Sequence, residues 1–342
     1  MKDSHAQASV DLETITGNVA ALGAHVAPSA VMAVVKADGY GHGAVTAARA
    51  ALRGGAQWLG VAHVAEALEL RAAGIDSPLL CLMAIGEHAH REAISAGVDL
   101  SAGSVGMVRR LAEAGAAAGR PARVHLKADT GLSRGGATAA DWPSVLNAAL
   151  SAQTAGHLTV AGLWSHFASA DEPGNPSVAV QLAAFEDALA VADKAGVTPE
   201  VRHIANTAAA LLVPDTRYDL VRIGGGIYGV STLPGGPPSW LRPALASPAT
   251  AAPAASSPAA ATTAGRRAAW TRRRSRRRSA PGRTGRPARG GLRRCSRCAV
   301  LRGWPRPFPR PPARPRTPRA APLRTDCPAR RRTRSATRAL PR

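Results

Sequence analysis

The sequence has few of the features that mark exported or membrane-bound proteins. Of its 342 residues only four are cysteine, and a single one, Cys81, precedes residue 246, which excludes a disulfide framework there and suits a reducing compartment. No apolar run reaches the roughly 20 residues that span a bilayer. The N-terminal stretch MKDSHAQASVDLE lacks the apolar core of a signal peptide. We therefore expect a cytoplasmic location.

Acidic residues are almost missing from one part of the chain. Residues 1–245 hold 17 Lys and Arg against 21 Asp and Glu, whereas residues 246–342 hold the other 27 of the 44 basic residues and a single acid, Asp326. The second part also has 15 of the 27 prolines and no Tyr, Met, Ile or Lys. It cannot bury enough apolar surface to offset the entropy of the chain. We predict a folded domain over 1–245 and a disordered Arg/Pro/Ala-rich tail over 246–342.

Residues 1–245 alternate between short apolar, β-branched runs and Ala/Leu/Glu/Arg-rich stretches with helical spacing. The pattern predicts helices over 44–56 and 105–119, among others, and strands over 31–37, 58–64, 79–84, 98–103, 123–129, 160–167, 202–206 and 219–225. Such alternation indicates parallel strands joined by helical crossovers. Eight units in roughly 250 residues favour an α/β fold of the (β/α)₈ TIM-barrel type, with a doubly wound open sheet as the alternative.

Polar residues recur where the predicted strands end, which is where a barrel carries its chemistry. They are Lys36, His63, Lys127, Arg134, His166, Asn206 and Arg222. In the stretch AVVKADGYGHG (33–43), Lys36 ends an apolar strand, so its stem is partly desolvated and its amine is suited to form a Schiff base with a carbonyl. The glycines allow close backbone approach to a ligand, and Tyr40 offers a hydroxyl to a phosphate. A solvated or salt-bridging lysine is the alternative.

Five blocks resemble, in the same order, blocks of the alanine racemase family. They are AVVKADGYGHG (33–43), KADTGLSRGG (127–136), SHFASAD (165–171), HIANTAA (203–209) and DLVRIGGGIYG (219–229). The first resembles the family's lysine motif for pyridoxal 5′-phosphate (PLP), and the resemblance covers about residues 9–245. It implies a PLP-binding (β/α)₈ barrel in a homodimeric isomerase. The implied activity is the interconversion of L-alanine and D-alanine for peptidoglycan precursor synthesis.

The resemblance also implies roles for the candidate residues. Lys36 would hold PLP as a Schiff base and act as the base on one face of the substrate α-carbon. Arg222 would face the pyridine nitrogen, and because arginine does not readily lose its proton, that nitrogen would stay unprotonated. His166 would hydrogen-bond Arg222 and orient the second base. Arg134 would bind near the substrate carboxylate, held by Lys127 if that lysine is carbamylated as in many family members.

The phosphate of the cofactor would be bound by hydroxyls and backbone N–H groups, which commonly form oxyanion sites. The resemblance assigns this role to Tyr40, Thr207, Gly224 and Gly225, and places Asn206 beside the cofactor. A plain helix N-cap is the alternative for Asn206 and Thr207. No metal ligand set is implied.

The resemblance stops just after residues 241–245, where the family's C-terminal β-domain would begin. That domain supplies the second base, a tyrosine, across the homodimer, together with a Met-Asp segment that helps to bind substrate. The last tyrosine here is Tyr228, and no methionine follows Met107. Because the composition of 246–342 is typical of a GC-rich gene read in the wrong frame, we hypothesise a frameshift near codon 246. The chain as written would then racemise poorly, and its dimer would be in doubt.

Two other functions stay open on the sequence. Without a second base the chain would act like the one-domain PLP-binding barrels that handle the cofactor rather than a substrate. The stretch RRRSRRR would bind nucleic acid non-specifically at low salt, although few aromatic residues accompany it. CSRC (295–298) and Cys327 supply fewer than the four ligands of a structural zinc site, and the tail has no histidine. We predict no metal, no membrane partner and no specific nucleic-acid partner.

Overall fold

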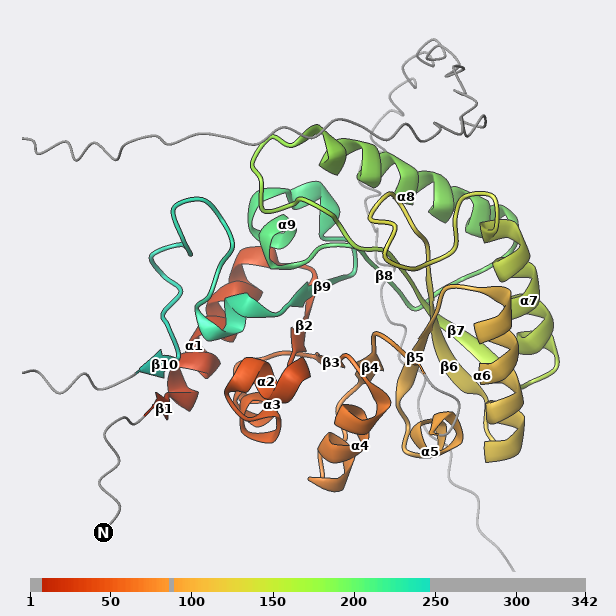
Figure 1. The fold of residues 1–342 in the computed structure, drawn as a ribbon, viewed down its shortest axis with the longest axis horizontal. Helices are drawn as coiled ribbons and strands as arrows, with labels where there is room; N and C mark the ends of the chain where they lie inside the picture. The colour runs from red at the N-terminus through yellow and green to blue at the C-terminus, as the bar shows by residue number, and fades with distance from the viewer. Residues whose placement is uncertain (1–7, 86–88, 247–342) are drawn as a thin grey trace, which may run out of the picture. The chain divides into compact units, whose positions relative to one another are not determined.

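A computed structural model describes residues 8–85 and 89–246 of the chain (Figure 1). The predictions for the tail are disorder, nucleic-acid binding and the CSRC pair. They concern residues that lie outside the described ranges, except that Ala246, the first tail residue, is described. None of the described helices is both long enough and apolar enough to cross a lipid bilayer.

Eight parallel strands form one sheet in the order β8-β7-β6-β5-β4-β3-β2-β9. They are β2 (Ala30–Val34), β3 (Trp58–Val61), β4 (Leu79–Cys81), β5 (Asp99–Ala102), β6 (Ala122–Lys127), β7 (Leu158–Trp164), β8 (Val201–His203) and β9 (Leu220–Ile223). The two edge strands are joined in turn, because the N–H of Asp219 donates to Arg202 C=O (3.2 Å) and that of Arg222 donates to Ala205 C=O (3.0 Å). The sheet therefore closes into a (β/α)₈ barrel, and the open doubly wound sheet is excluded.

All eight predicted strands are present, and each ends before its predicted last residue. β2 stops at Val34 and not at residue 37, and β7 stops at Trp164 and not at residue 167. The predicted strand ends extended into loops whose residues are apolar enough to read as strand. Most of the polar candidates thus lie in the loops after the strands, while Lys127 and Arg222 remain within β6 and β9.

Helices lie around the outside of the barrel (Figure 1). They are α1 (Leu12–Val26), α2 (Lys36–Gly41), α3 (Ala44–Arg53), α4 (Val64–Ala72), α5 (His90–Ser95), α6 (Val105–Ala118), α7 (Trp142–Thr154), α8 (Pro176–Lys194) and α9 (Thr207–Leu212), with 3₁₀ turns η1 (Pro214–Thr216) and η2 (Gly225–Tyr228). The helices predicted over 44–56 and 105–119 are confirmed as α3 and α6. Local signals set their ends: α6 starts where Ser104 Oγ accepts the N–H of Met107 (3.2 Å) and stops at the left-handed Gly119.

Alternate residues of the strands face two different environments. In β2, Val31 and Ala33 belong to the large core between sheet and helices, whereas Met32 and Val34 form a separate cluster with Leu80 and Leu220. Because successive side chains of a strand point to opposite faces, this second set fills the inside of the barrel. The same alternation, followed from strand to strand through their register, places a set of polar residues inside the barrel: Asp99, Arg123, His125, Lys127, His203 and Arg222.

A short ribbon outside the barrel was not predicted. β1 (Ser9–Val10) pairs antiparallel with β10 (Leu245–Ala246). The N–H of Asp11 also donates to Ala244 C=O (2.8 Å). This pairing joins the segment that precedes α1 to the segment that follows the last barrel turn.

Candidate active site

Lys36 opens a turn with an unusual backbone directly after β2. Four successive residues have left-handed φ, namely Ala37 (51°), Asp38 (50°), Gly39 (62°) and Tyr40 (56°). For residues other than glycine this conformation costs roughly 1–2 kcal/mol each. Three such residues within a run of four persist only where their surroundings hold them. Lys36 itself is half-buried and lies at the carboxyl-terminal end of β2, directly before this turn.

Two carboxylates hold this turn in place. Glu66, on α4, accepts the N–H of Ala37 at 2.7 Å with one oxygen and that of Ala62 at 2.7 Å with the other. Asp38 accepts the N–H of Ala44, the first residue of α3, at 2.7 Å. The backbone that follows Lys36 is thereby tied to the loop after β3 and to the start of α3.

Three of the residues predicted to bind phosphate come together beside this turn. The hydroxyl of Thr207 accepts the N–H of Gly224 at 3.2 Å. The hydroxyl of Tyr40 occupies the place where a Cβ on Gly224 would stand, so a side chain there would displace it. No hydrogen bond between residues of the described ranges uses the Tyr40 hydroxyl, and Tyr40 is 43% exposed. Two hydroxyls and a bare backbone thus form one cradle, with Gly225 the next residue along.

Asn206 is a helix N-cap. Its side-chain oxygen accepts the N–H of Ala209 at 3.0 Å, which fixes the start of α9. The contacts of Asn206 are therefore those of the helix N-cap that was named as the alternative to a place beside the cofactor. By setting the first turn of α9, Asn206 also sets where the Thr207 hydroxyl points.

Arg222 lies inside the barrel and is 4% exposed. Its Nη2 donates to the carbonyls of Ser165 (2.8 Å) and Ile204 (3.0 Å) and to Nδ1 of His166 (3.1 Å). Its Nη1 donates to Nδ1 of His203 at 2.9 Å. Burial lowers the pKa of the Arg222 guanidinium to about 9, so the group stays protonated at neutral pH. The structure brings His166 and Arg222 together, as the family resemblance implied.

His166 is the point on which the predicted cations converge. Burial, and then the charges of Arg222, Arg134, Lys127 and Lys36, lower the pKa of the His166 imidazole to about 2. The ring is therefore neutral, and because Nδ1 accepts from Arg222, its proton is on Nε2. The four positive charges that act on this neutral ring make the site attractive to anions.

Lys127 and Arg222 share one aromatic surface. Nζ of Lys127 lies 4.8 Å from the centroid of the Trp164 ring, and Cζ of Arg222 lies 4.9 Å from it. Burial, and then the charges of Arg134 and Arg222, lower the pKa of the Lys127 amine to about 8. Contact with the ring face offsets part of this repulsion. Arg134 itself is exposed in the loop that follows β6.

Several polar residues of the barrel interior were missed by sequence reasoning. His125 and His203 are fully buried, and Asp99 is 4% exposed. The sequence does contain a signal for Asp99 and His125, because each is a polar residue that alternates with apolar residues along its strand. That signal becomes readable only once the inward face of each strand is known.

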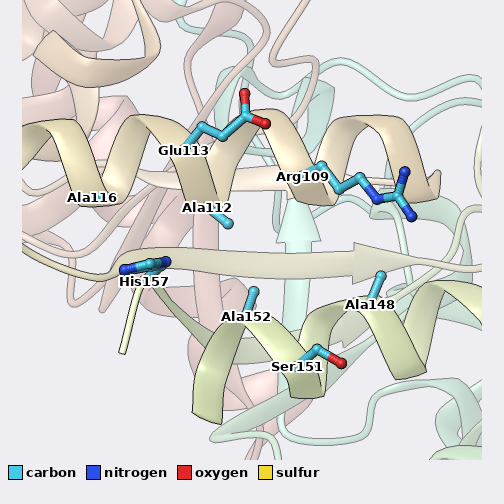
Figure 2. A pocket seen from close by; sticks show the side chains of 8 residues that line it. All are labelled: Arg109, Ala112, Glu113, Ala116, Ala148, Ser151, Ala152 and His157. Carbon is cyan, nitrogen blue, oxygen red and sulfur yellow. The ribbon is translucent and has the colours of Figure 1, made fainter. Parts of the chain in front are cut away.

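A separate hollow of about 460 Å³ lies outside the barrel between α6 and α7 (Figure 2). Alanines form half of its lining, with Arg109 and Glu113 on α6 and His157 directly before β7. None of the predicted site residues lines it. Within the described ranges no group of three or more His, Cys, Asp or Glu side chains is placed to hold a metal ion. Burial raises the pKa of the Cys81 thiol to about 12, which makes it unreactive.

Comparisons with known proteins bear on this site. The family described as "Alanine racemase, N-terminal domain" matches residues 10–232. An alanine racemase of Thermobifida fusca (strain YX) is 54% identical over 242 residues, which cover 71% of this chain and 65% of the relative. An alanine racemase of Streptomyces coelicolor is 49% identical over 248 residues, covering 70% and 63%. The crystal structure of alanine racemase from D-cycloserine-producing Streptomyces lavendulae has 49% identity and a TM-score of 0.69, covering 72% and 65%. The chain thus spans less than two thirds of the length of these relatives.

Proposed function

Because the chain belongs to the alanine racemase N-terminal domain family, we propose that its barrel, residues 1–245, binds pyridoxal 5′-phosphate and acts on the α-carbon of alanine. The reaction of the whole protein would be the interconversion of L-alanine and D-alanine in the cytoplasm, for peptidoglycan precursor synthesis. The observation that carries the proposal is the hydrogen bond between the buried Arg222 and the neutral His166, on which the charges of Lys36, Lys127 and Arg134 also act. Such a site suits a cofactor phosphate and a substrate carboxylate.

The residues of the site fit this cofactor. The Lys36 amine would hold the aldehyde carbon. The hydroxyls of Tyr40 and Thr207 would hold the phosphate together with the backbone of Gly224 and Gly225, because the missing Cβ at Gly224 is what leaves room for the Tyr40 hydroxyl. When bound, PLP supplies a conjugated, electron-withdrawing ring that acidifies the Cα–H bond of an amino acid.

Arg222 is placed to act on the pyridine nitrogen. Its Nη1 and Nη2 make the hydrogen bonds described above, and no hydrogen bond between residues of the described ranges uses its Nε–H. The guanidinium would offer a donor to that nitrogen and keep its own proton. The loaded ring would then withdraw electrons less strongly than a protonated pyridine. Arg134 would meet the substrate carboxylate from the exposed loop after β6.

Proton movement at the substrate needs one group on each face of the α-carbon. Lys36 Nζ serves one face as base and as acid in turn. In the predicted scheme the second group is a tyrosine of the β-domain, which His166 would orient. We propose that the chain as written lacks this group, so that it exchanges the α-proton on one face and interconverts the enantiomers poorly.

The test is to identify the lysine that carries the cofactor. The full chain is incubated with PLP, reduced with borohydride and mapped by peptide mass spectrometry. We expect pyridoxyl on Lys36 and its loss in Lys36→Arg. The exposed Lys194→Arg is the matched control and should label like the natural chain. A label confined to another lysine, or no label at all, would refute the proposal.

A further inference from the structure

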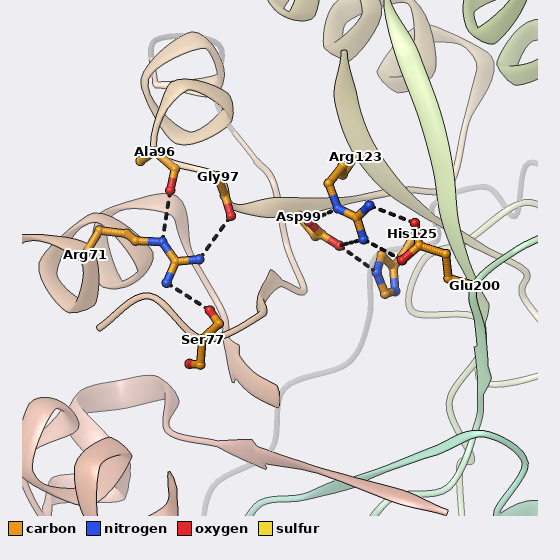
Figure 3. A network of polar contacts seen from close by, with 8 residues as sticks. All are labelled: Arg71, Ser77, Ala96, Gly97, Asp99, Arg123, His125 and Glu200. Atoms are coloured by element: carbon orange, nitrogen blue, oxygen red, sulfur yellow. Dashed lines mark hydrogen bonds and ion pairs between the residues drawn. The ribbon is translucent and has the colours of Figure 1, made fainter. Parts of the chain in front are cut away.

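A line of hydrogen-bonded side chains runs through the barrel interior behind Arg222. Figure 3 shows its outer part, in which Arg123 on β6 lies between Asp99 on β5 and Glu200. Arg123 donates to Asp99 Oδ1 (2.9 Å) and to Glu200 Oε1 (2.7 Å). From Asp99 the line continues to His125, whose Nε2 lies 3.2 Å from Asp99 Oδ2. It therefore starts at a half-exposed ion pair and leads inward.

The backbone is shaped to admit His125. The register between β6 and β7 shifts here, so that Val124 is opposite Val160 but His125 is opposite Gly162. A Cβ on Gly162 would run into the His125 ring. Bulges commonly re-aim a side chain. The irregular register and the missing side chain of Gly162 thus make room for the His125 imidazole inside the barrel.

The direction of each hydrogen bond follows from Arg222. A guanidinium only donates, so Nδ1 of His203 accepts from it at 2.9 Å and the proton of neutral His203 is on Nε2. That N–H donates to Nδ1 of His125 at 2.9 Å, which leaves the His125 proton on Nε2. This second N–H donates to the Asp99 carboxylate. One arrangement of protons satisfies all four groups.

The charges agree with this arrangement. Burial, and then the charge of Arg222, hold the pKa of His203 well below its ordinary value, so its ring is neutral. Burial raises the pKa of the Asp99 carboxyl, but hydrogen bonds from His125 and Arg123, together with the charge of Arg123, outweigh it and lower the pKa overall. Asp99 is thus an ionised acceptor. A metal-binding reading of the two histidines fails, because each of their ring nitrogens already faces a hydrogen-bond partner.

The orientation of His203 has an independent support. Trp164 stacks on it with the ring planes 7° apart and the centroids 5.7 Å apart. Stacking fixes the plane of the imidazole but not which edge faces Arg222. A ring turned over in that plane would set Cδ2–H against the guanidinium and Cε1–H against His125. The acceptor that His125 offers to Nε2–H is what selects the productive edge.

We propose that Asp99 and His125 are positioning residues that hold His203 with Nδ1 toward Arg222. They fix the guanidinium that is to face the cofactor ring nitrogen, and in this respect the inference rests on the proposed function. A carboxylate that orients an imidazole, which in turn orients the working group, is a recurrent device of active sites. Here the device has two imidazoles in series and reaches the site from the opposite end of the barrel.

The first test needs neither variant nor cofactor. The full chain is labelled with ¹⁵N-histidine, and the protonated nitrogen of each ring is identified by long-range ¹H–¹⁵N correlation at pH 7. We expect Nε2–H for both His125 and His203, with slow exchange of these protons. Nδ1–H on either ring, or averaging between the two forms, would overturn the proposal.

The second test measures the effect on Arg222. The chain is loaded with PLP that is ¹⁵N-labelled at the ring nitrogen, and His125→Phe, His125→Gln and Asp99→Asn are compared with the natural chain. We expect a shifted ring-nitrogen signal and about tenfold weaker retention of PLP. The exposed His157→Gln is the control and should match the natural chain. An unchanged signal and affinity in a folded variant would overturn the proposal.

The two tests fail separately. If the natural chain does not load PLP on Lys36, the proposed function fails, while the histidine protons still decide whether the hydrogen-bonded line is as derived. If PLP loads but the ring nitrogen is insensitive to Asp99 and His125, the function stands and the positioning role is wrong.

Discussion

The carboxylate of Glu66 accepts the backbone N–H of Ala37 at 2.7 Å, so a residue of α4 fixes the position directly after Lys36. The same carboxylate accepts the N–H of Ala62 at 2.7 Å. One side chain therefore ties the loop after β2 to the loop after β3. Because the turn after Lys36 is left-handed over four residues, it depends on such ties more than an ordinary turn does.

Glu66→Gln tests this dependence. An amide has a single acceptor oxygen, so at least one backbone N–H loses its partner, at a cost of about 1–3 kcal/mol. We expect a lower free energy of unfolding and a smaller fraction of pyridoxyl-labelled Lys36. Glu69→Gln, on the exposed face of the same helix, is the control for both measurements. Equal labelling in the two variants would show that the turn after Lys36 keeps its conformation without the Glu66 carboxylate.

Deuterium exchange tests whether one base or two bases act on the α-proton of the substrate. L-alanine and D-alanine are incubated separately in D₂O with the PLP-loaded chain. With Lys36 as the single working base, we expect deuterium at Cα of one enantiomer and little of the opposite enantiomer. Rapid interconversion would mean that a second base is present, and no exchange in either enantiomer would favour a cofactor-handling protein.

Lys127 is predicted to react with carbon dioxide. Its amine has a pKa of about 8, so the neutral fraction, small at pH 6, rises steeply through physiological pH. A neutral amine adds to CO₂, an N–C bond forms and one proton is released. The product would be an anion between Arg134 and Arg222, where the amine cation is repelled.

The measurement is a ¹³C spectrum of the chain in labelled bicarbonate. We expect a carbamate signal that grows from pH 6 to pH 8 as the Lys127 amine loses its proton. Lys127→Ala should remove the signal and Lys194→Ala should not. A signal that survives in Lys127→Ala would place the modification elsewhere.

Acid sensitivity follows from the two buried, neutral histidines. The pKa of His166 is lowered to about 2 and that of His203 is well below the ordinary value. In the unfolded chain both titrate near 6.5. The unfolded state thus binds more protons below that pH, and stability is lost as pH falls from about 6.5, by up to about 1.4 kcal/mol per pH unit for each group.

Urea unfolding of the cofactor-free chain at pH 7.5, 6 and 5 measures this loss. His166→Gln should reduce the slope of stability against pH by about one proton. The exposed His157→Gln keeps the full slope in this prediction. An identical slope in His166→Gln would mean that His166 becomes protonated without unfolding.

The sequence predicted the barrel because its signals are local. The apolar runs, the helical spacing and caps such as Ser104 each act within a few residues. Strand ends were placed too late, because closure of the sheet, and not composition, decides where a strand stops. Residues near a motif, such as Lys36, Tyr40 and Arg222, were found as candidates.

Residues whose role depends on contacts with residues distant in the sequence were not predicted. Glu66 is 29 positions from Ala37, and His203 is 78 positions from His125. Neither pair has a sequence spacing that suggests contact. Their partnership depends on which strands are neighbours and on the bulge opposite His125, both of which belong to the assembled sheet.

The left-handed turn also limits how this segment can vary. Ala37 and Asp38 are both exposed, although the Asp38 carboxylate also accepts the N–H of Ala44. Their φ values of 51° and 50° lie in the left-handed region. A β-branched residue is a genuine outlier at positive φ, so valine or isoleucine would be disfavoured at both positions despite their exposure. Handedness, and not packing, is therefore the main filter on substitutions beside Lys36.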